Sequence, residues 1–145
     1  MEENKTIVSV GAVIENDAGE ILLVKHKPER EGYWKGKWIC PGGKLKVGEK
    51  IEEGIKREVF EETHLNIQLT KPLVPFERIV KSDGKTILHV IYIDYEAKLE
   101  SGVLIPDDDV GEAMWVKKEK IFDLSNELHD DTKKLLELTG IYHGI

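Results

Sequence analysis

Cysteine is nearly absent from this sequence, which contains only Cys40. A single thiol excludes an internal disulfide and a zinc site built from cysteines. Its neighbours Ile39 and Pro41 favour a small buried apolar side chain over a reactive thiol. Long apolar runs are also missing: the longest, 21–24 and 90–93, fall far short of the roughly 20 residues that a bilayer requires. The first residues lack the apolar stretch of a signal peptide, so we expect a cytoplasmic protein without membrane association.

An excess of positive charge is lacking as well, because 21 Lys and Arg residues stand against 28 Asp and Glu residues, for a net charge of -7. No overall positive field attracts nucleic acid, and we expect none as a partner. An acidic chain can still bind phosphates through a bridging divalent cation. The 145 residues, 40% of them hydrophobic and 34% charged, predict one folded domain over 1–145.

Hydrophobic periodicity predicts a layered α/β fold. We expect strands at 6–14, 21–24, 38–40, 87–98 and 114–116. We expect helices at 50–63, 118–124 and 129–139. Pro72 and Pro75 indicate a connection, and 25–37 is typical of a solvent-facing loop. Because both faces of 87–98 are apolar, this strand is expected at the centre of a sheet covered on both sides, which favours an α/β sandwich.

The predicted helix at 50–63 carries carboxylates beside its apolar face. Ile51 and Ile55 mark that face, and at about 100° per residue Glu58 and Glu62 lie only about 40° apart around it. Unpaired buried carboxylates are costly, so a cation must compensate them. Glu61 adds a third oxygen donor, and three converging carboxylates suit Mg²⁺ or Mn²⁺. The alternative is a solvated acidic face, but the opposite side of the helix already carries charged residues for solubility.

The segment from Gly43 to Leu65 contains a recognisable motif. Gly43 is followed after five residues by Glu49, and after seven more by a run that starts Arg57-Glu58. This spacing resembles the 23-residue box of the Nudix hydrolases, Gly-x5-Glu-x7-Arg-Glu-aliphatic-x-Glu-Glu-x-Gly-aliphatic. The one departure is His64, which stands in place of the last glycine. Histidine tolerates the positive φ expected there at a cost of about 1 kcal/mol, so we expect altered loop shape or stability but intact metal chemistry.

The resemblance implies a Nudix-type α/β/α sandwich, with a mixed β-sheet between helices. It also implies Mg²⁺-dependent cleavage of a diphosphate linkage by attack of water on phosphorus. The implied catalytic residues are Glu58, Glu61, Glu62, Arg57 and Glu49, of which the first three would ligate the metal and the last two would form a supporting ion pair. The family often adds an acid from a later loop, for which Asp109 is the first candidate and Glu112 the second. A solvated acidic loop is the alternative for 107–109.

Which carboxylate acts as the general base stays open within the set Glu58, Glu61, Glu62 and Asp109. The candidates for substrate contacts are Lys25, His26, Trp34, Gly42, Gly43 and Lys44. The lysines could equally be ordinary surface residues. Aromatic faces stack on nucleobases, which makes Trp34 the candidate for base stacking, whereas Trp38 in a predicted strand is expected in the core.

We therefore expect a Nudix pyrophosphohydrolase that uses Mg²⁺ or Mn²⁺ to cleave a nucleoside triphosphate or another nucleoside diphosphate derivative. Two alternatives stay open: an ADP-ribose pyrophosphatase and a non-catalytic nucleotide-sensing module. The first gains no support, because Val80 stands where that group often has proline. The second usually loses box carboxylates, which are present here. A homodimer is compatible with the resemblance.

Overall fold

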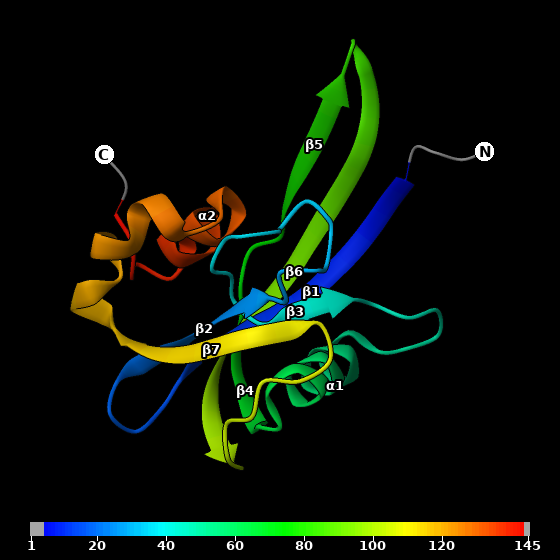
Figure 1. Ribbon diagram of the computed structural model, residues 1–145. Helices are drawn as coiled ribbons and strands as arrows, with labels where there is room; N and C mark the ends of the chain where they lie inside the picture. Colours follow the sequence, from blue (N-terminus) through cyan, green and yellow to red (C-terminus); the bar gives the residue numbers. More distant parts are fainter. Residues whose placement is uncertain (1–4, 144–145) are drawn as a thin grey trace.

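The computed structural model describes residues 5–143 and is built around a mixed β-sheet (Figure 1). Its strands are β1 (Lys5–Glu15), β2 (Glu20–His26), β3 (Gly42–Lys44), β4 (Asn66–Pro72), β5 (Phe76–Ser82), β6 (Lys85–Ser101) and β7 (Val110–Lys117). The strand order is β4-β6-β1-β2-β7, with β3 paired to β1 and β5 paired to β6. Strands β1 and β6 run parallel and the other pairs are antiparallel, so the sheet is mixed, as predicted.

Two α-helices, α1 (Ile51–Thr63) and α2 (Asp130–Leu138), pack against opposite faces of the sheet. Successive side chains of a strand point to opposite faces, and β1 uses both. Its residues Val10, Ala12 and Ile14 share one core with Val59 of α1, whereas Val13 shares a second core with Leu136 of α2. The predicted α/β/α sandwich is therefore confirmed. No helix within 5–143 is long and apolar enough to cross a membrane.

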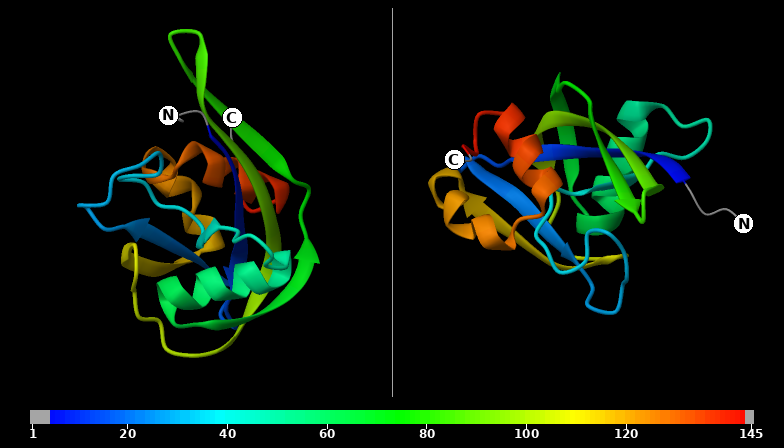
Figure 2. Two further views of the ribbon diagram at one scale, coloured as in Figure 1. Left: turned by 90° about the vertical axis from the view of Figure 1, so that its right-hand side faces the viewer. Right: turned by 90° about the horizontal axis from the view of Figure 1, so that it is seen from above.

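The long strand β6 has two edge strands on one side, and the sequence patterns missed both. Strand β4 pairs with its second half and β5 with its first half, with the connection around Pro75 between them. Pro72 is tolerated because it ends an edge strand, where a missing N–H costs little. The hairpin of β5 and β6 projects beyond the rest of the sheet (Figures 1 and 2). The other side of β6 lies against β1, so its predicted central position is confirmed.

Three predicted elements differ in position or type. The strand expected at 38–40 is reduced to single bridges, from Ile39 to Val24 and from Trp38 to Leu128, and the regular pairing comes later, at β3. The helix expected at 118–124 is a pair of 3₁₀ helices, η1 (Lys118–Lys120) and η2 (Phe122–Glu127). Strand β7 begins at Val110 rather than at 114. The helices expected at 50–63 and 129–139 correspond to α1 and α2.

The segment 39–44 lies between β1 and β2 and holds them apart. Ile39 pairs with Val24 of β2, and Gly42 pairs with Gly11 of β1. The segment 39–44 and β1 approach closely at Gly11. A Cβ added there would lie 2.7 Å from the Pro41 carbonyl oxygen and 2.8 Å from Oδ1 of Asp94. Glycine at position 11 is therefore a steric requirement of this crossing.

His64 ends α1 in the left-handed conformation expected for the last position of that turn, with φ 63°. Its backbone N–H donates to the Phe60 carbonyl at 2.9 Å, and its ring stacks on the Phe60 ring. Its Nε2 lies 2.8 Å from Oδ2 of Asp107. These side-chain contacts, which a glycine lacks, offset part of the cost of the conformation.

Replacing Gly11 with alanine should lower the free energy of unfolding by about 1–3 kcal/mol, because the added methyl group overpacks the crossing of 39–44 with β1. Urea unfolding followed by circular dichroism measures this change. Gly111→Ala is the matched control, since a Cβ there meets only Lys27, at 3.2 Å, and should change stability by less than about 1 kcal/mol. Equal losses in the two variants would contradict the steric role of Gly11.

Candidate active site

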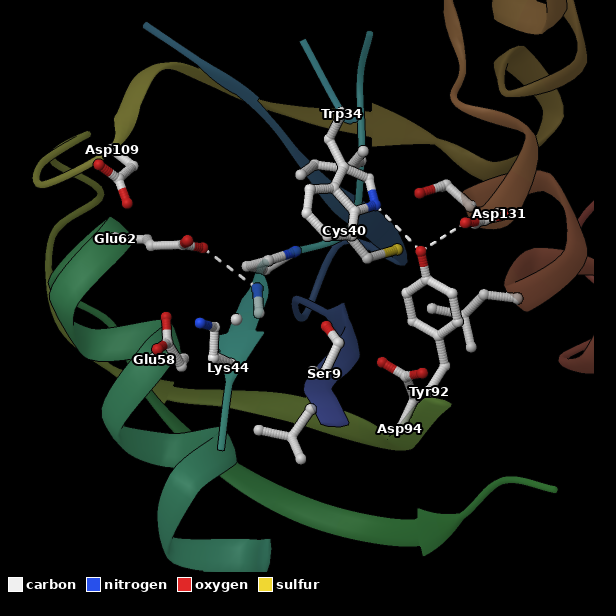
Figure 3. Close-up of a pocket in the computed structure, with 18 of the residues that line it drawn as sticks. Ser9, Trp34, Cys40, Lys44, Glu58, Glu62, Tyr92, Asp94, Asp109 and Asp131 are labelled. Atoms are coloured by element: carbon white, nitrogen blue, oxygen red, sulfur yellow. Dashed lines mark hydrogen bonds between the residues drawn. The ribbon is translucent and has the colours of Figure 1, made fainter. Parts of the chain in front are cut away.

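A cavity of about 220 Å³ opens where the segment 39–44 separates β1 from β2 (Figure 3). We call one end the acidic end: it is lined by Glu58 and Glu62 of α1 and by Asp109 of the loop before β7. Asp108 of the same loop also lines the cavity, and its charge acts on both glutamates. We call the other the aromatic end: it is lined by Trp34, Tyr92, Asp94 and Asp131, and by Phe76, whose ring stacks on that of Tyr92. The strand β3 with Gly43 and Lys44 borders the acidic end, so two chemically different surfaces meet in one cavity.

Glu62 is the most buried carboxylate of the acidic end, with 3% of its surface exposed. Burial raises its pKa well above the usual range, and the nearby charges of Glu58 and the loop acids raise it further. The backbone N–H of Gly42 donates a hydrogen bond to its Oε1 at 3.1 Å. Burial also raises the pKa of Glu58, against the opposing effect of Arg57. This concentration of negative charge favours a bound cation.

Arg57 connects four groups around α1. Its Nε donates to Oε2 of Glu49 at 2.5 Å and its Nη2 donates to Oε1 at 3.0 Å, so the predicted ion pair is present and bidentate. This pairing lowers the pKa of Glu49 to about 2. The Nη1 group donates to Glu58 at 2.9 Å and to Glu61 at 3.0 Å. Nη2 also donates to the Lys44 carbonyl at 3.1 Å, which ties α1 to β3.

The donor set of the acidic end fits a hard divalent cation, although it is not preassembled. Within 5–143, no group of three His, Cys, Asp or Glu side chains is already arranged to hold a metal. Glu58 and Glu62 face the cavity, whereas Glu61 is turned toward Arg57 and lines a separate shallow hollow beside His64. An added Cβ on Gly43 would overlap the Glu58 carboxylate, so glycine lets β3 lie directly against it. Carboxylate oxygens are the ligands that such cations prefer.

The structure divides the other candidates between the cavity and its surroundings. Asp109 lines the cavity and pairs with Arg30 at 3.3 Å, and His26, within 3.2 Å of the same guanidinium, lines it too. Glu112 does not reach the cavity, because it is exposed on β7 opposite Lys25. The Lys25 ammonium lies over the Trp38 ring, 4.7 Å from its centroid, and does not line the cavity either.

Asp108 is a cavity residue that the sequence did not single out. The loop places it there with φ 55°, a backbone conformation that the acidic run alone does not predict. From the sequence, Asp108 was considered only as a member of the acidic run 107–109.

A chain of hydrogen bonds fixes the aromatic end. The indole N–H of Trp34 donates to the Tyr92 hydroxyl at 3.0 Å, and that hydroxyl donates to Oδ2 of Asp131. Nε of Arg78 donates to the other Asp131 oxygen at 2.7 Å. Trp34 thus lines the cavity, which is required of a residue that stacks on a bound base. Trp38 is buried in the core with 7% of its surface exposed, as expected.

Asp94 is the second residue that the sequence patterns missed. It lies on the central strand β6 with 6% of its surface exposed, and its Oδ2 has no hydrogen-bond partner in the described part of the chain. Burial raises its pKa to about 7. The sequence does contain a sign of its importance, because Asp94 interrupts the otherwise apolar and aromatic run 90–95. A charged residue within a buried strand is rare unless it is paired or functional.

Comparison with known proteins accounts for this arrangement. The family model of the NUDIX domain matches residues 5–139. The chain belongs to the Nudix hydrolase family.

Two similar proteins show how far the Nudix likeness extends. The nucleoside triphosphatase NudI of Escherichia coli O17:K52:H18 is 30% identical over 136 residues, which cover 89% of this chain and 93% of the relative. The crystal structure of a MutT protein from Methanosarcina mazei Go1 is 30% identical, with a TM-score of 0.69 over 89% of this chain and 88% of that one.

A MutT Nudix hydrolase from Burkholderia pseudomallei is 26% identical, with a TM-score of 0.77 over 93% of this chain and 98% of that one. This Nudix protein is accordingly a hydrolase that acts on phosphoric anhydrides of nucleotide derivatives and uses a divalent metal. The acidic end contains Glu58 and Glu62 of the Nudix box, so the box and the cavity coincide.

The raised pKa of Asp94 predicts a pH-dependent stability. An aspartate titrates near pH ~3.9 in an unfolded chain, whereas burial raises the pKa of Asp94 to about 7. The folded protein binds more protons than the unfolded chain between these values, so its stability falls as the pH rises through them. Asp94→Asn has no carboxyl group at this position, so the variant does not lose stability in this way. Its free energy of unfolding relative to that of the parent protein should therefore rise by about 2.5 kcal/mol from pH 5 to pH 8.

Urea unfolding at both pH values measures this difference. Asp123→Asn, at an exposed position of η2, is the matched control and should show a pH-independent effect. A gain for Asp94→Asn that stays constant with pH would show that Asp94 is ionised in the folded protein at pH 5.

Proposed function

We propose that this Nudix hydrolase cleaves nucleoside triphosphates to a nucleoside monophosphate and pyrophosphate, with Mg²⁺ as its metal. The observation that carries this proposal is the continuity of the cavity, in which buried Glu62 and an aromatic surface share one space. Phosphates bridged by a cation suit the acidic end, and a base suits the aromatic end. The relative named as a nucleoside triphosphatase supports this substrate class.

The proposed metal ligands are Glu58, Glu61 and Glu62, joined by Asp108 or Asp109 from the facing loop. Bound Mg²⁺ would polarise phosphate oxygens and lower the pKa of a water molecule. Carboxylates are hard oxygen ligands that suit Mg²⁺ and Mn²⁺ alike, so Mn²⁺ can take the place of Mg²⁺ at this site. Glu112 is left out because it does not line the cavity.

The chain's own groups position these carboxylates. Arg57 holds Glu58 and Glu61 through its Nη1 group, while Glu49 fixes the guanidinium from the other side. The Gly42 N–H orients Glu62. Lys44 adds a positive charge at the cavity wall, suited to a phosphate group. The general base is assigned to the set Glu58, Glu61, Glu62 and Asp109, each of which can accept a proton from water.

Glu58→Gln, Glu61→Gln and Glu62→Gln should each lower kcat by at least about 100-fold, because each removes a negative charge from the metal site. Pyrophosphate release from a panel of nucleoside triphosphates with Mg²⁺ measures the loss. Glu53→Gln is the matched control: it lies on the same helix but is exposed, and it should retain parental turnover. Parental activity in Glu58→Gln and Glu62→Gln would contradict the proposal.

The same panel separates the alternatives when it includes ADP-ribose, diadenosine polyphosphates and nucleotide sugars. Turnover of ADP-ribose without turnover of any triphosphate would replace the proposed substrate by that alternative. Nucleotide binding without any turnover would favour the sensing module.

Mg²⁺ binding provides a test without turnover. Calorimetric titration should show Mg²⁺ binding to the parent protein and at least about tenfold weaker binding to Glu62→Gln, since the charge of a buried ligand is lost. Glu53→Gln should bind as the parent does. Unchanged affinity in Glu62→Gln would remove this residue from the ligand set.

A homodimer, a cytoplasmic location and the absence of nucleic-acid binding stay predictions. Light scattering after size-exclusion chromatography determines the first of these.

A further inference from the structure

The aromatic end holds a buried carboxyl group that the hydrolysis of a phosphate anhydride does not use. Asp94 of β6 lies opposite Gly11 of β1, two pairs along from Tyr92 and Ser9 and therefore on the same face of the sheet. In Figure 3 the side chains of Tyr92 and Asp94 lie across the cavity from Glu58 and Glu62. Asp94 is therefore separate from the proposed metal ligands.

The carboxyl group of Asp94 is buried but lacks hydrogen-bond donors in the described part of the chain. The glycine at position 11 leaves room for the Asp94 carboxyl group, since a Cβ on residue 11 would lie 2.8 Å from Oδ1 of Asp94. Its Oδ2 has no hydrogen-bond partner in the described part of the chain, although the residue is 6% exposed and lines the cavity. A buried acceptor without a donor costs free energy in the absence of ligand. Donors supplied by a ligand would recover that cost.

The polar groups hydrogen-bonded around Tyr92 already have partners. The Trp34 indole N–H donates to Tyr92, and the Tyr92 hydroxyl donates to Asp131. Asp131 also accepts from Arg78. Burial raises the pKa of the Cys40 thiol, which stays protonated and uncharged. Asp94, by contrast, lines the cavity without a hydrogen bond to either of its oxygens in the described part of the chain, so a bound base could supply the missing donors.

We propose that Asp94 is a specificity-determining residue that accepts hydrogen bonds from two adjacent N–H groups on the edge of a guanine base. The inference rests on the proposed function, which places a nucleoside in this cavity. A carboxylate has two oxygens and accepts hydrogen bonds at both. Among the common bases, guanine presents two neighbouring donors, N1–H and the 2-amino group. Adenine and cytosine present a donor beside an acceptor, and uracil and thymine present one N–H between two carbonyls.

The burial of Asp94 strengthens this preference. Hydrogen bonds to an ionised acceptor are about twice as strong as neutral ones. With the pKa of Asp94 raised to about 7, a ligand that donates two hydrogen bonds favours the ionised form, and that form pairs best with guanine. The ring of such a base would lie against the aromatic surface of Trp34 and Tyr92.

A pair of monophosphates tests this without hydrolysis, because they contain no phosphoric anhydride. GMP and IMP differ only in the 2-amino group that Asp94 is proposed to bind. Isothermal titration calorimetry with Mg²⁺ at pH 8 should show about tenfold tighter binding of GMP than of IMP. Equal affinity of the parent protein for the two would overturn the inference.

Asp94→Asn keeps the shape of the side chain but replaces one acceptor by an amide donor. Its preference for GMP over IMP should fall to about twofold or less, while Asp123→Asn, on the surface of η2, should keep the parental ratio. An undiminished ratio in a folded Asp94→Asn variant would overturn the inference. The comparison of GMP with IMP on the parent protein decides the question even where the variant fails to fold.

Hydrolysis of GTP and ITP, measured in parallel, separates this inference from the proposed function. Turnover of both at equal kcat/KM would leave the function standing and overturn the role of Asp94. Tighter binding of GMP without turnover of any triphosphate would support the role of Asp94 and contradict the function. Turnover that favours GTP about tenfold supports both.

Discussion

The insertion of the segment 39–44 between β1 and β2 is the constraint on which the site depends. It holds the two strands apart through pairing with Val24 on one side and Gly11 on the other. The resulting gap is the cavity, bordered by α1 at one end and by the side chains of β6 and α2 at the other. Glycines allow this, because close backbone approach at Gly11 and contact of Glu58 with Gly43 leave no room for a Cβ. Backbone sterics thereby bring a metal-binding helix and an aromatic surface together.

The two ends of the cavity use buried acids differently. At the acidic end, Arg57 and the Gly42 N–H orient carboxylates whose mutual repulsion favours a cation. At the aromatic end, Asp131 is fully engaged by Arg78 and Tyr92, and Asp94 retains an unpaired oxygen. Each unsatisfied acid reduces the stability of the free protein and increases what a ligand gains on binding. Binding capacity and lost stability are thus two consequences of the same burial.

Local patterns predicted the parts of the structure that depend on local sequence. The period of the apolar residues identified α1, and the Nudix spacing identified Glu58, Glu62 and the pair of Arg57 with Glu49. The short edge strands β4 and β5 were missed, because their stability comes from pairing with β6 rather than from their own pattern. The chain of Trp34, Tyr92 and Asp131 joins residues far apart in sequence, which no local period reveals. The position of Asp108 at the cavity depends on a loop conformation that the acidic run 107–109 does not predict.

The central claim is that one cavity binds phosphates through a metal at one end and a guanine base at the other. The most direct measurement is a crystal structure with Mn²⁺, located by its anomalous scattering, and a GTP analogue with a methylene group in place of the bridging oxygen between its α and β phosphorus atoms. The account predicts Mn²⁺ bound by Glu58 and Glu62, with the edge of the base against Asp94. A metal bound away from these glutamates, or a base outside the aromatic end, would contradict it.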